Sequence, residues 1–157
     1  MKIFLAADHR GFRLKETLTS WLQTQGYEVE DCGNTHLDLE DDYVDFTRVE
    51  AKKLLAALKN QPSTPLLHTT AIAICGSGIG VSIAANRFKG IRCALCMSPE
   101  HAIHARKNDH SNMLALASEY VSTENAQAII KAFLSTEESH EEKYTRRTLK
   151  LDDTSSA

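Results

Sequence analysis

The sequence contains no apolar run that approaches the roughly 20 residues needed to span a membrane. It also lacks an excess of positive charge, because 18 Lys and Arg residues stand against 21 Asp and Glu residues. The resulting net charge of −3 gives no overall basic field of the kind that attracts nucleic acids. The first apolar stretch reaches Asp8 too soon to be a signal peptide. We therefore expect a protein of the cytoplasm that acts on neither membranes nor nucleic acids.

Cysteine is scarce too, and its pattern excludes the usual cysteine-built frameworks. A disulfide-stabilised fold is not expected in a chain of 157 residues without an export signal. Cys93 and Cys96 have the spacing C-x-x-C, but they stand inside an apolar, strand-like run, and no second pair completes a zinc site. We predict buried structural thiols at these positions, with a redox or metal role as the alternative.

The chain does contain a regular alternation of short β-rich runs and longer helical patterns, without an internal repeat. The predicted strands are Lys2–Ala7, Tyr27–Asp31, Ala71–Cys75, Gly90–Cys96 and Met113–Ala117. The predicted helices are one from Phe12 that Gly26 closes, then Val44–Leu58, Val81–Phe88, Pro99–Lys107 and Thr123–Leu134. Strands separated by helices predict right-handed crossovers and a parallel sheet that helices cover on both faces. We expect a single domain over residues 1–151.

The C-terminal tail differs in character from the rest of the chain. Residues 137–151 are charged, yet Tyr144, Leu149 and Leu151 need an apolar surface to pack on. A neighbouring subunit is one candidate for that surface. Residues 152–157 are predicted to be disordered.

The most informative motif is the glycine-rich stretch Cys75–Gly80, which joins a predicted strand to a predicted helix. Such a turn presents N–H groups at a positive helix end, where an oxyanion or phosphate binds well and a thiolate is favoured. The spacing of its glycines fits neither a dinucleotide fingerprint nor a P-loop, and Ser77 lacks the frame of a nucleophile elbow. The alternative is a connection that only lets helix and strand pack.

Asp8 and His9 stand at the end of the first predicted strand. A carboxylate beside an imidazole can open a sugar ring, by moving a proton from the anomeric hydroxyl to the ring oxygen. Asp8 could instead cap the first helix, and the two roles are compatible. Active sites of parallel α/β folds lie at the carboxyl ends of strands, so we expect one cleft to hold Asp8, Cys75 and Asn108–Asn112.

These motifs resemble type B ribose-5-phosphate isomerase, a family that also holds the galactose-6-phosphate isomerase subunits. The stretches that carry the resemblance are Ala7–Phe12, Leu14-Lys15, Asp42-Tyr43, Ile74–Gly80 and Ile83–Asn86. The resemblance implies a Rossmann-like three-layer α/β/α sandwich with a five-stranded parallel sheet and a C-terminal helical tail. It also implies homodimers or homotetramers with the active site between subunits, and no metal or organic cofactor.

The resemblance further implies that an aldose phosphate and a ketose phosphate interconvert through a cis-enediolate. Cys75 would carry the proton between C1 and C2, Asp8 would take part in ring opening, and Ser77 would bind the enediolate. Val81 stands where one branch of the family has a glutamate base, which indicates the cysteine branch. The implied substrate-binding residues, with His9 at the phosphate end, are His9, Tyr43, Gly76, Gly78, Ile79, Gly80, Asn108, Asp109, Lys143 and Arg147.

Several positions depart from the pattern of the family. Asn108 and Asp109 stand where members commonly have a His and an Asn before the fifth strand, and that His assists ring opening. Asparagine cannot donate and recover a proton as an imidazole does. His110, two positions further, is a candidate substitute. Glu119 replaces an Arg that often follows the fifth strand.

The tail and the loops depart as well. Lys143 replaces an Arg, and it binds phosphate as a point charge without the guanidinium fork. Arg147 would be the second phosphate contact, with Arg146 as the alternative in register. Tyr43 is followed by Val44 in place of the usual Pro, and the loop Asn60–His68 is longer than expected.

The leading hypothesis is therefore isomerisation of ribose 5-phosphate to ribulose 5-phosphate. Another sugar phosphate (a tetrose phosphate, allose 6-phosphate or galactose 6-phosphate) is the alternative, because polar sites discriminate strongly between hydroxyl patterns. A non-catalytic sugar-phosphate-binding subunit is a further alternative, although a pure binder has no use for Cys75. A nucleotide-binding Rossmann protein is the remaining one, and the failed fingerprint counts against it.

Overall fold

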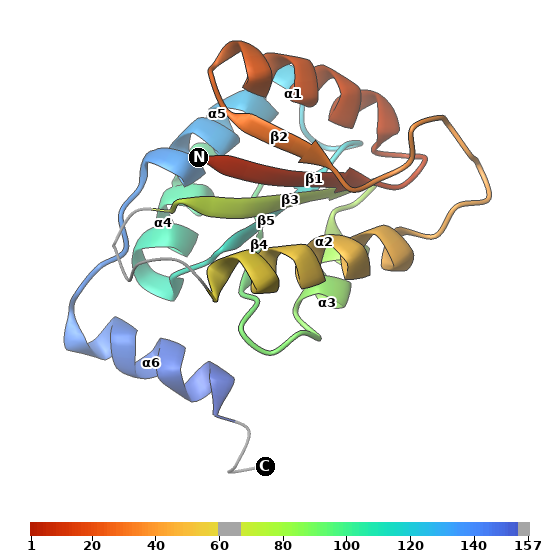
Figure 1. The fold of residues 1–157 in the computed structure, drawn as a ribbon. Coiled ribbons are helices and arrows are strands. Elements are labelled where there is room, and N and C mark those ends of the chain that lie inside the picture. Colours follow the sequence, from red (N-terminus) through yellow and green to blue (C-terminus); the bar gives the residue numbers. More distant parts are fainter. Residues whose placement is uncertain (60–66, 154–157) are drawn as a thin grey trace.

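The computed structural model describes residues 1–59 and 67–153. Its centre is a five-stranded sheet in the order β2-β1-β3-β5-β4, and every paired strand is parallel to its neighbour (Figure 1). The strands are β1 (Lys2–Ala7), β2 (Glu28–Asp31), β3 (Thr69–Cys75), β4 (Cys93–Leu95) and β5 (Met113–Ala117). The predicted three-layer α/β/α fold with a five-stranded parallel sheet is confirmed.

Helices cover both faces of this sheet. The strand side chains that point to either face are apolar, and both faces are therefore buried. The helices α1 (Phe12–Thr24), α4 (Pro99–Asp109) and α5 (Thr123–Ser135) pack on one face, against the side chains of Ile3, Leu5, Ile72 and Ile74. The other face, which carries Phe4, Ala6, Ala71 and Ala73, is covered by α2 (Tyr43–Leu58) and α3 (Ile79–Ala85). The thiols of Cys93 and Cys96 are buried and free, as predicted.

The fourth strand is much shorter than the predicted Gly90–Cys96. Side-chain amides bond the backbone around its start, in addition to the backbone N–H groups of Asn112 and Met113, which donate to the carbonyl oxygen of Arg92. Asn112 Oδ1 accepts the N–H of Arg92 at 2.9 Å, and its Nδ2 donates to the carbonyl of Gly90 at 2.7 Å. Asn86 then bonds both backbone groups of Cys93, at 2.9 Å each. Cys93 also pairs with Met113, so Asn86 bonds the free edge of this outer strand. Apolar composition alone did not reveal these amide contacts.

The last helix, α6 (Glu142–Asp152), extends away from the sandwich, and among the other helices it packs mainly against α4 (Figure 1). Its presence confirms the predicted helical tail. Leu149 and Leu151 are 68% and 65% exposed, so the described part of their own chain does not supply the surface that they need. Asp152, the first residue of the segment predicted to be disordered, is the last residue of α6, and residues 154–157 lie outside the described residues. Most of the loop predicted over 60–68 also lies outside them.

Helix α2 places a carboxyl group inside the core. The apolar Val49 is exposed, whereas its neighbour Glu50 is fully buried beside Ala51 and Leu54. Glu50 Oε1 accepts the N–H of Ile72 at 3.0 Å, while its Oε2 has no hydrogen-bond partner among the described residues. Burial raises the pKa of Glu50 well above its ordinary value of 4.5.

This buried acid gives the first testable prediction, which concerns the pH dependence of stability. Between pH 4.5 and the raised pKa of Glu50, the unfolded carboxyl is ionised while the folded one keeps its proton. The native state then binds more protons, so the free energy of unfolding falls as pH rises, by at most about 1.4 kcal/mol per pH unit. Glu50→Gln removes this slope and gains stability relative to the wild type from pH 5 to pH 8. Urea unfolding across that range measures it, and parallel curves would contradict the assignment.

Candidate active site

Cys75 ends the central strand β3, and its side chain lies on the face covered by α2 and α3. Its Sγ atom accepts a hydrogen bond from the N–H of Gly78 at 3.2 Å. Cys75 as a whole is only 5% exposed. A thiol with a backbone N–H directed at it is a good candidate for a group that takes up and returns a proton.

Because its glycines have no Cβ, the glycine loop is packed closely by neighbouring side chains. Gly78 has φ +72° and packs so closely that a Cβ there would stand 2.5 Å from the side chain of Leu95. A Cβ on Gly80 would stand 2.8 Å from the ring of Tyr43, which places this predicted residue directly beside the loop. Ser77 Oγ accepts the N–H of Ile79 at 3.3 Å. The N–H groups of the loop therefore meet at the thiol and the hydroxyl, where a substrate oxygen would compete for them.

Asp8 follows β1, and it lies beside Cys75 at the end of the neighbouring strand β3. The register shows this, because the preceding residues Ala7 and Ile74 are paired. Its Oδ1 atom accepts the N–H groups of Arg10 and Gly11, at 3.0 Å each. The first helix is capped at Gly11, so Asp8 shapes the turn before the helix and is not its N-cap. Burial is the main cause that raises the pKa of Asp8. A carboxyl with a raised pKa beside a thiol suits proton transfer to and from sugar oxygens.

His9 is held by a residue that the sequence did not single out. Its Nδ1 lies 2.7 Å from Asp41 Oδ1, and its backbone N–H donates to the same oxygen at 2.9 Å. The hydrogen bond to Asp41 is the main cause that raises the pKa of His9. Asp41 is one of several acids in the stretch 38–42, and nothing in their spacing distinguishes it from the others.

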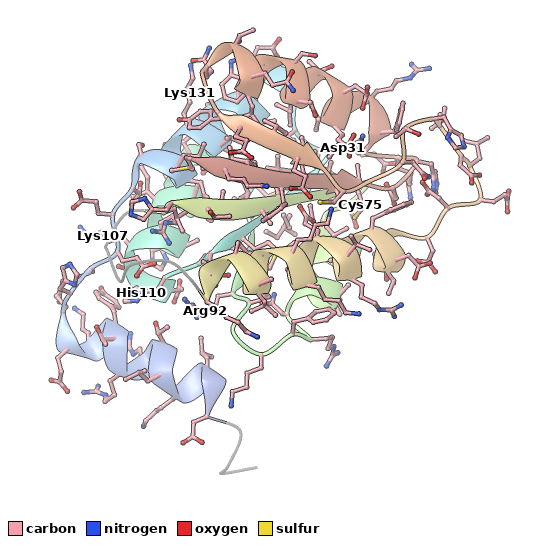
Figure 2. The ribbon with its side chains drawn as sticks, in the orientation of Figure 1. Asp31, Cys75, Arg92, Lys107, His110 and Lys131 are labelled. Carbon is pink, nitrogen blue, oxygen red and sulfur yellow. The ribbon has the colours of Figure 1, made fainter. Side chains whose placement is uncertain are left out.

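The other predicted residues lie at the opposite edge of the sheet. Cys75 stands at the end to which the strands point, whereas His110 and α4's last turn stand at the end from which they start (Figure 2). Asn112 directly precedes β5, so Asn108–Asn112 belongs to the amino edge. The expectation of one cleft within one chain is therefore wrong, because α4 runs back against the strands before β5 begins.

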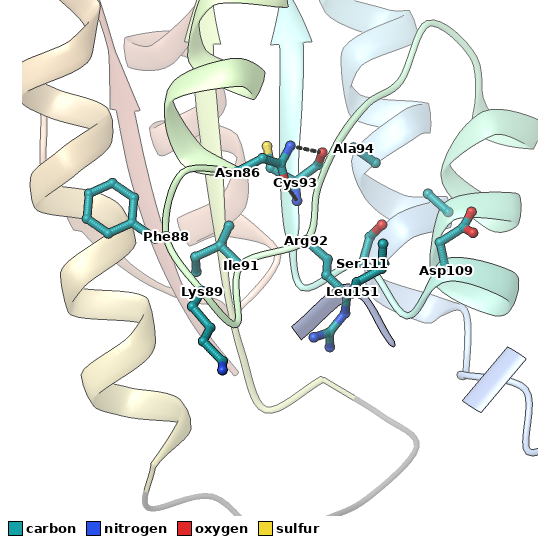
Figure 3. A pocket seen from close by; sticks show the side chains of 11 residues that line it. Asn86, Phe88, Lys89, Ile91, Arg92, Cys93, Ala94, Asp109, Ser111 and Leu151 are labelled. Carbon is teal, nitrogen blue, oxygen red and sulfur yellow. Dashed lines mark hydrogen bonds between the residues drawn. The ribbon is translucent and has the colours of Figure 1, made fainter. Parts of the chain in front are cut away.

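Two cavities border this amino edge. One, of about 500 Å³, lies among Arg92, Asp109, Ser111 and the side chain of Leu151 from α6 (Figure 3). A second, of about 380 Å³, lies between α4 and α6; its lining includes His104, Lys107, Asn108 and Tyr144. Asn108 and Asp109 are thus accessible from cavities that Cys75 does not line.

Comparison with known proteins adds to this geometry. A family model described as ribose/galactose isomerase matches residues 3–151. The chain belongs to this family. A protein of Mycoplasma genitalium named probable ribose-5-phosphate isomerase B is 38% identical over 132 residues, which cover 84% of this chain and 82% of that protein. The resemblance found in the sequence motifs is confirmed.

Solved structures of the family share the whole fold. Ribose-5-phosphate isomerase B of Mycoplasma genitalium with bound ribulose-5-phosphate aligns with a TM-score of 0.87 at 33% identity, covering 99% of this chain and 96% of that one. The ribose 5-phosphate isomerase of Thermotoga maritima aligns with a TM-score of 0.85 at 37% identity, over 98% of each chain. The described part of the chain has no helix long and apolar enough to cross a membrane.

In this member of the isomerase family, the negative charge of Glu119 is balanced by Arg10, which lies in the turn between β1 and α1. Glu119 forms an ion pair with Arg10, and a Cβ on Gly76 would stand 2.7 Å from Arg10 Nε. Ser118 Oγ donates toward the carbonyl oxygens of Arg10 and Cys75, at 3.0 and 3.1 Å. The positive charge beside the glycine loop therefore comes from the turn after β1.

His110 does not offer a free imidazole in place of Asn108. It is buried at the C-cap of α4 with φ 51°, and its Nε2 lies 3.0 Å from the carbonyl oxygen of Ser139. Its Nδ1 lies 3.5 Å from Glu138, which also pairs with the fully buried Arg106 at 2.9 Å. His110 thus anchors the segment that leads into α6.

The cationic residues of α6 differ in their local partners. Lys143 Nζ pairs with Glu141 at 2.8 Å, and this hydrogen bond is the first cause that raises the pKa of Lys143. Arg146 pairs with Glu142 at 2.9 Å. Arg147 is exposed and makes no hydrogen bond or ion pair within residues 1–59 and 67–153, which leaves its guanidinium available to an anion.

Proposed function

We propose that this protein is an aldose-ketose isomerase that interconverts ribose 5-phosphate and ribulose 5-phosphate through a cis-enediolate. The observation that carries the proposal is the contact of the Cys75 thiol with the Gly78 N–H beside the carboxyl of Asp8. Family membership and the relatives named ribose-5-phosphate isomerase support the same substrate. The reaction would belong to the pentose phosphate pathway.

The residues divide the reaction into two proton transfers. Ring opening moves a proton from the anomeric hydroxyl to the ring oxygen, and Asp8, whose pKa is raised, can exchange protons with either oxygen. Cys75, as thiolate, then takes the proton from C2 and returns it to C1. The enediolate oxygens gain charge during this step, and Ser77 and the N–H groups of Gly78 and Ile79 lie where they can stabilise it.

We further propose that the working unit is a homodimer with a site shared between two chains. Support comes from the separation of Asp8 and Cys75 from Asn108, Asp109, Lys143 and Arg147, which lie at or near the opposite edge of the sheet. A two-fold axis can bring the carboxyl edge of one chain to the amino edge and α6 of another. The exposed Leu149 and Leu151 would then pack on the partner.

A second candidate function is the isomerisation of another sugar phosphate (a tetrose phosphate, allose 6-phosphate or galactose 6-phosphate). The ion pair between Arg10 and Glu119 favours this candidate. A carboxylate here replaces the Arg that often follows the fifth strand in the family, so the charge at the rim of the glycine loop differs. Asn108 favours it as well, because an amide does not transfer protons. A non-catalytic sugar-phosphate-binding subunit would use the same surfaces without turnover.

Assay of the purified protein on aldose and ketose phosphates of four to six carbons separates these candidates. We expect the highest kcat/KM on ribose 5-phosphate, and discrimination of more than about 10-fold against six-carbon sugars, since buried polar groups penalise a mismatched hydroxyl. A higher kcat/KM on another sugar phosphate would favour the second candidate. Binding without turnover of any of them would contradict an isomerase.

A further inference from the structure

The segment between β2 and α2 passes the carboxyl end of β1 and contributes a carboxylate to the site (Figure 1). That carboxylate belongs to Asp41, whose side chain is only 4% exposed. Both of its oxygens are engaged: Oδ1 accepts from His9, and Oδ2 accepts from Asn34 Nδ2 at 2.9 Å. A carboxylate so enclosed holds one position and not a range of them.

The support continues one step deeper into the fold. Lys15 Nζ, which is fully buried, donates to the carbonyl oxygen of Asn34 at 3.0 Å and pairs with Asp31. The side chain of Asp41 is therefore fixed by Asn34, whose own backbone is fixed by a buried lysine on α1. Such a chain of hydrogen bonds is the usual means of orienting a functional imidazole.

The geometry determines which ring nitrogen of His9 carries a proton. A carboxylate oxygen only accepts hydrogen bonds, so the 2.7 Å contact requires a proton on Nδ1. Nε2 makes no hydrogen bond to any residue that the structure describes. The ring is 29% exposed, so Nε2 is free to meet a ligand. When the ring is protonated, Nε2–H becomes a charged donor.

We propose that Asp41 is a positioning residue, which holds the His9 ring through a hydrogen bond from Nδ1–H and stabilises its charged form, whose Nε2–H meets the phosphate group of the substrate. The identity of the ligand rests on the proposed function. The position of the proton on the His9 ring does not, because it follows from the contact with Asp41. A phosphate dianion is the chemical class that a fixed imidazolium recognises.

The charges around His9 agree with this role. Asp41 and Asp8 raise the pKa of His9, while partial burial and Arg10 lower it. Asp41 acts most strongly, through its hydrogen bond. A raised pKa keeps the ring charged to a higher pH, so the loss of Asp41 matters most on the alkaline side of neutrality.

The test compares Asp41→Asn with Asp45→Asn, a control that removes an exposed carboxylate in the first turn of α2. In Asp41→Asn we expect KM for ribose 5-phosphate to rise about 5–10-fold at pH 8, with little change at pH 6 and kcat within about twofold. The control should match the wild type at both pH values. An equal rise in KM at pH 6 and pH 8 would overturn the proposal.

A double-mutant cycle separates positioning from a general effect on the fold. His9→Ala removes the group through which Asp41 acts, so adding Asp41→Asn to it should change KM no further. A second rise in KM in that background would show that Asp41 acts by another route. Should Asp41→Asn fail to fold, Asn34→Ala removes only the support of Oδ2 and should shift the same pH dependence by a smaller amount.

Nitrogen-15 NMR of the His9 ring tests the inference without any turnover. The wild type should show the Nδ1-protonated form at high pH and a titration midpoint above that of Asp41→Asn, and inorganic phosphate should perturb Nε2. These signals persist even if the protein acts on a different sugar phosphate, so failure of the proposed function is distinguishable. A neutral ring that carries its proton on Nε2 at high pH, or a titration that Asp41→Asn leaves unchanged, would overturn the proposal.

Discussion

Replacement of Cys75 by serine is expected to lower kcat for ribose 5-phosphate by about 10³-fold, while the protein stays folded. Serine keeps the shape of the side chain, and its Oγ can accept the N–H of Gly78 as the sulfur does. A hydroxyl, however, is far too weak an acid to supply the base that removes a proton from C2. The measurement is the initial rate of ribulose 5-phosphate formation, with circular dichroism and a melting curve to confirm the fold.

Cys32→Ser is the matched control for this substitution. Cys32 is also buried in the cluster under α2, but its surroundings raise its pKa to about 11, mainly by desolvation. A thiol of that kind stays protonated at neutral pH and has no catalytic use. We expect the control to keep its kcat. Full activity in Cys75→Ser, or an equal loss in both variants, would contradict the role of Cys75 as base.

The second large effect is expected from mixing two inactive proteins. Cys75→Ser removes the base at the carboxyl edge, and the double variant Lys143→Ala/Arg147→Ala removes the cations of α6. If a site takes one edge from each chain, a mixed dimer has one site with both defects and one intact site. Half of the dimers are mixed after random exchange, so activity should return to about a quarter of the wild-type value.

The control for this experiment pairs defects from the same edge. Asp8 and Cys75 lie side by side at the carboxyl ends of β1 and β3, so they belong to the same site of the same chain. A mixture of Asp8→Ala with Cys75→Ser should therefore recover nothing. Both mixtures are refolded together from denaturant and assayed below the KM of the wild type. Recovery in the control, or none in the test mixture, would contradict a site shared between chains.

The sequence sufficed to predict the carboxyl-edge half of the candidate site. A strand that ends at Cys75 and another that ends at Ala7 must place the residues after them at one edge of a parallel sheet. Proximity to a strand, taken alone, predicts Asn108–Asn112 at the same edge. The residues precede β5 instead of following it, and the order of helix and strand along the chain contained that information.

Other features depend on tertiary contacts that spacing does not encode. Asp41 approaches His9 only after the segment from β2 to α2 folds over the end of β1. Glu50 occupies the inner face of α2, although acidic side chains are almost never fully buried in a core. Asn86 bonds the backbone of Cys93, and Asn112 bonds that of Gly90 and Arg92. An amide side chain in a sequence does not reveal its partner.

Helix α6 stands clear of the sandwich at the edge opposite Cys75. If Cys75 and the cations of α6 serve one site, as proposed, a single chain built this way cannot bring them together. If they meet between chains, the specific activity depends on protein concentration and falls upon dilution below the dissociation constant of the dimer. A substitution in the tail would then act in trans, on chemistry performed by the neighbouring molecule.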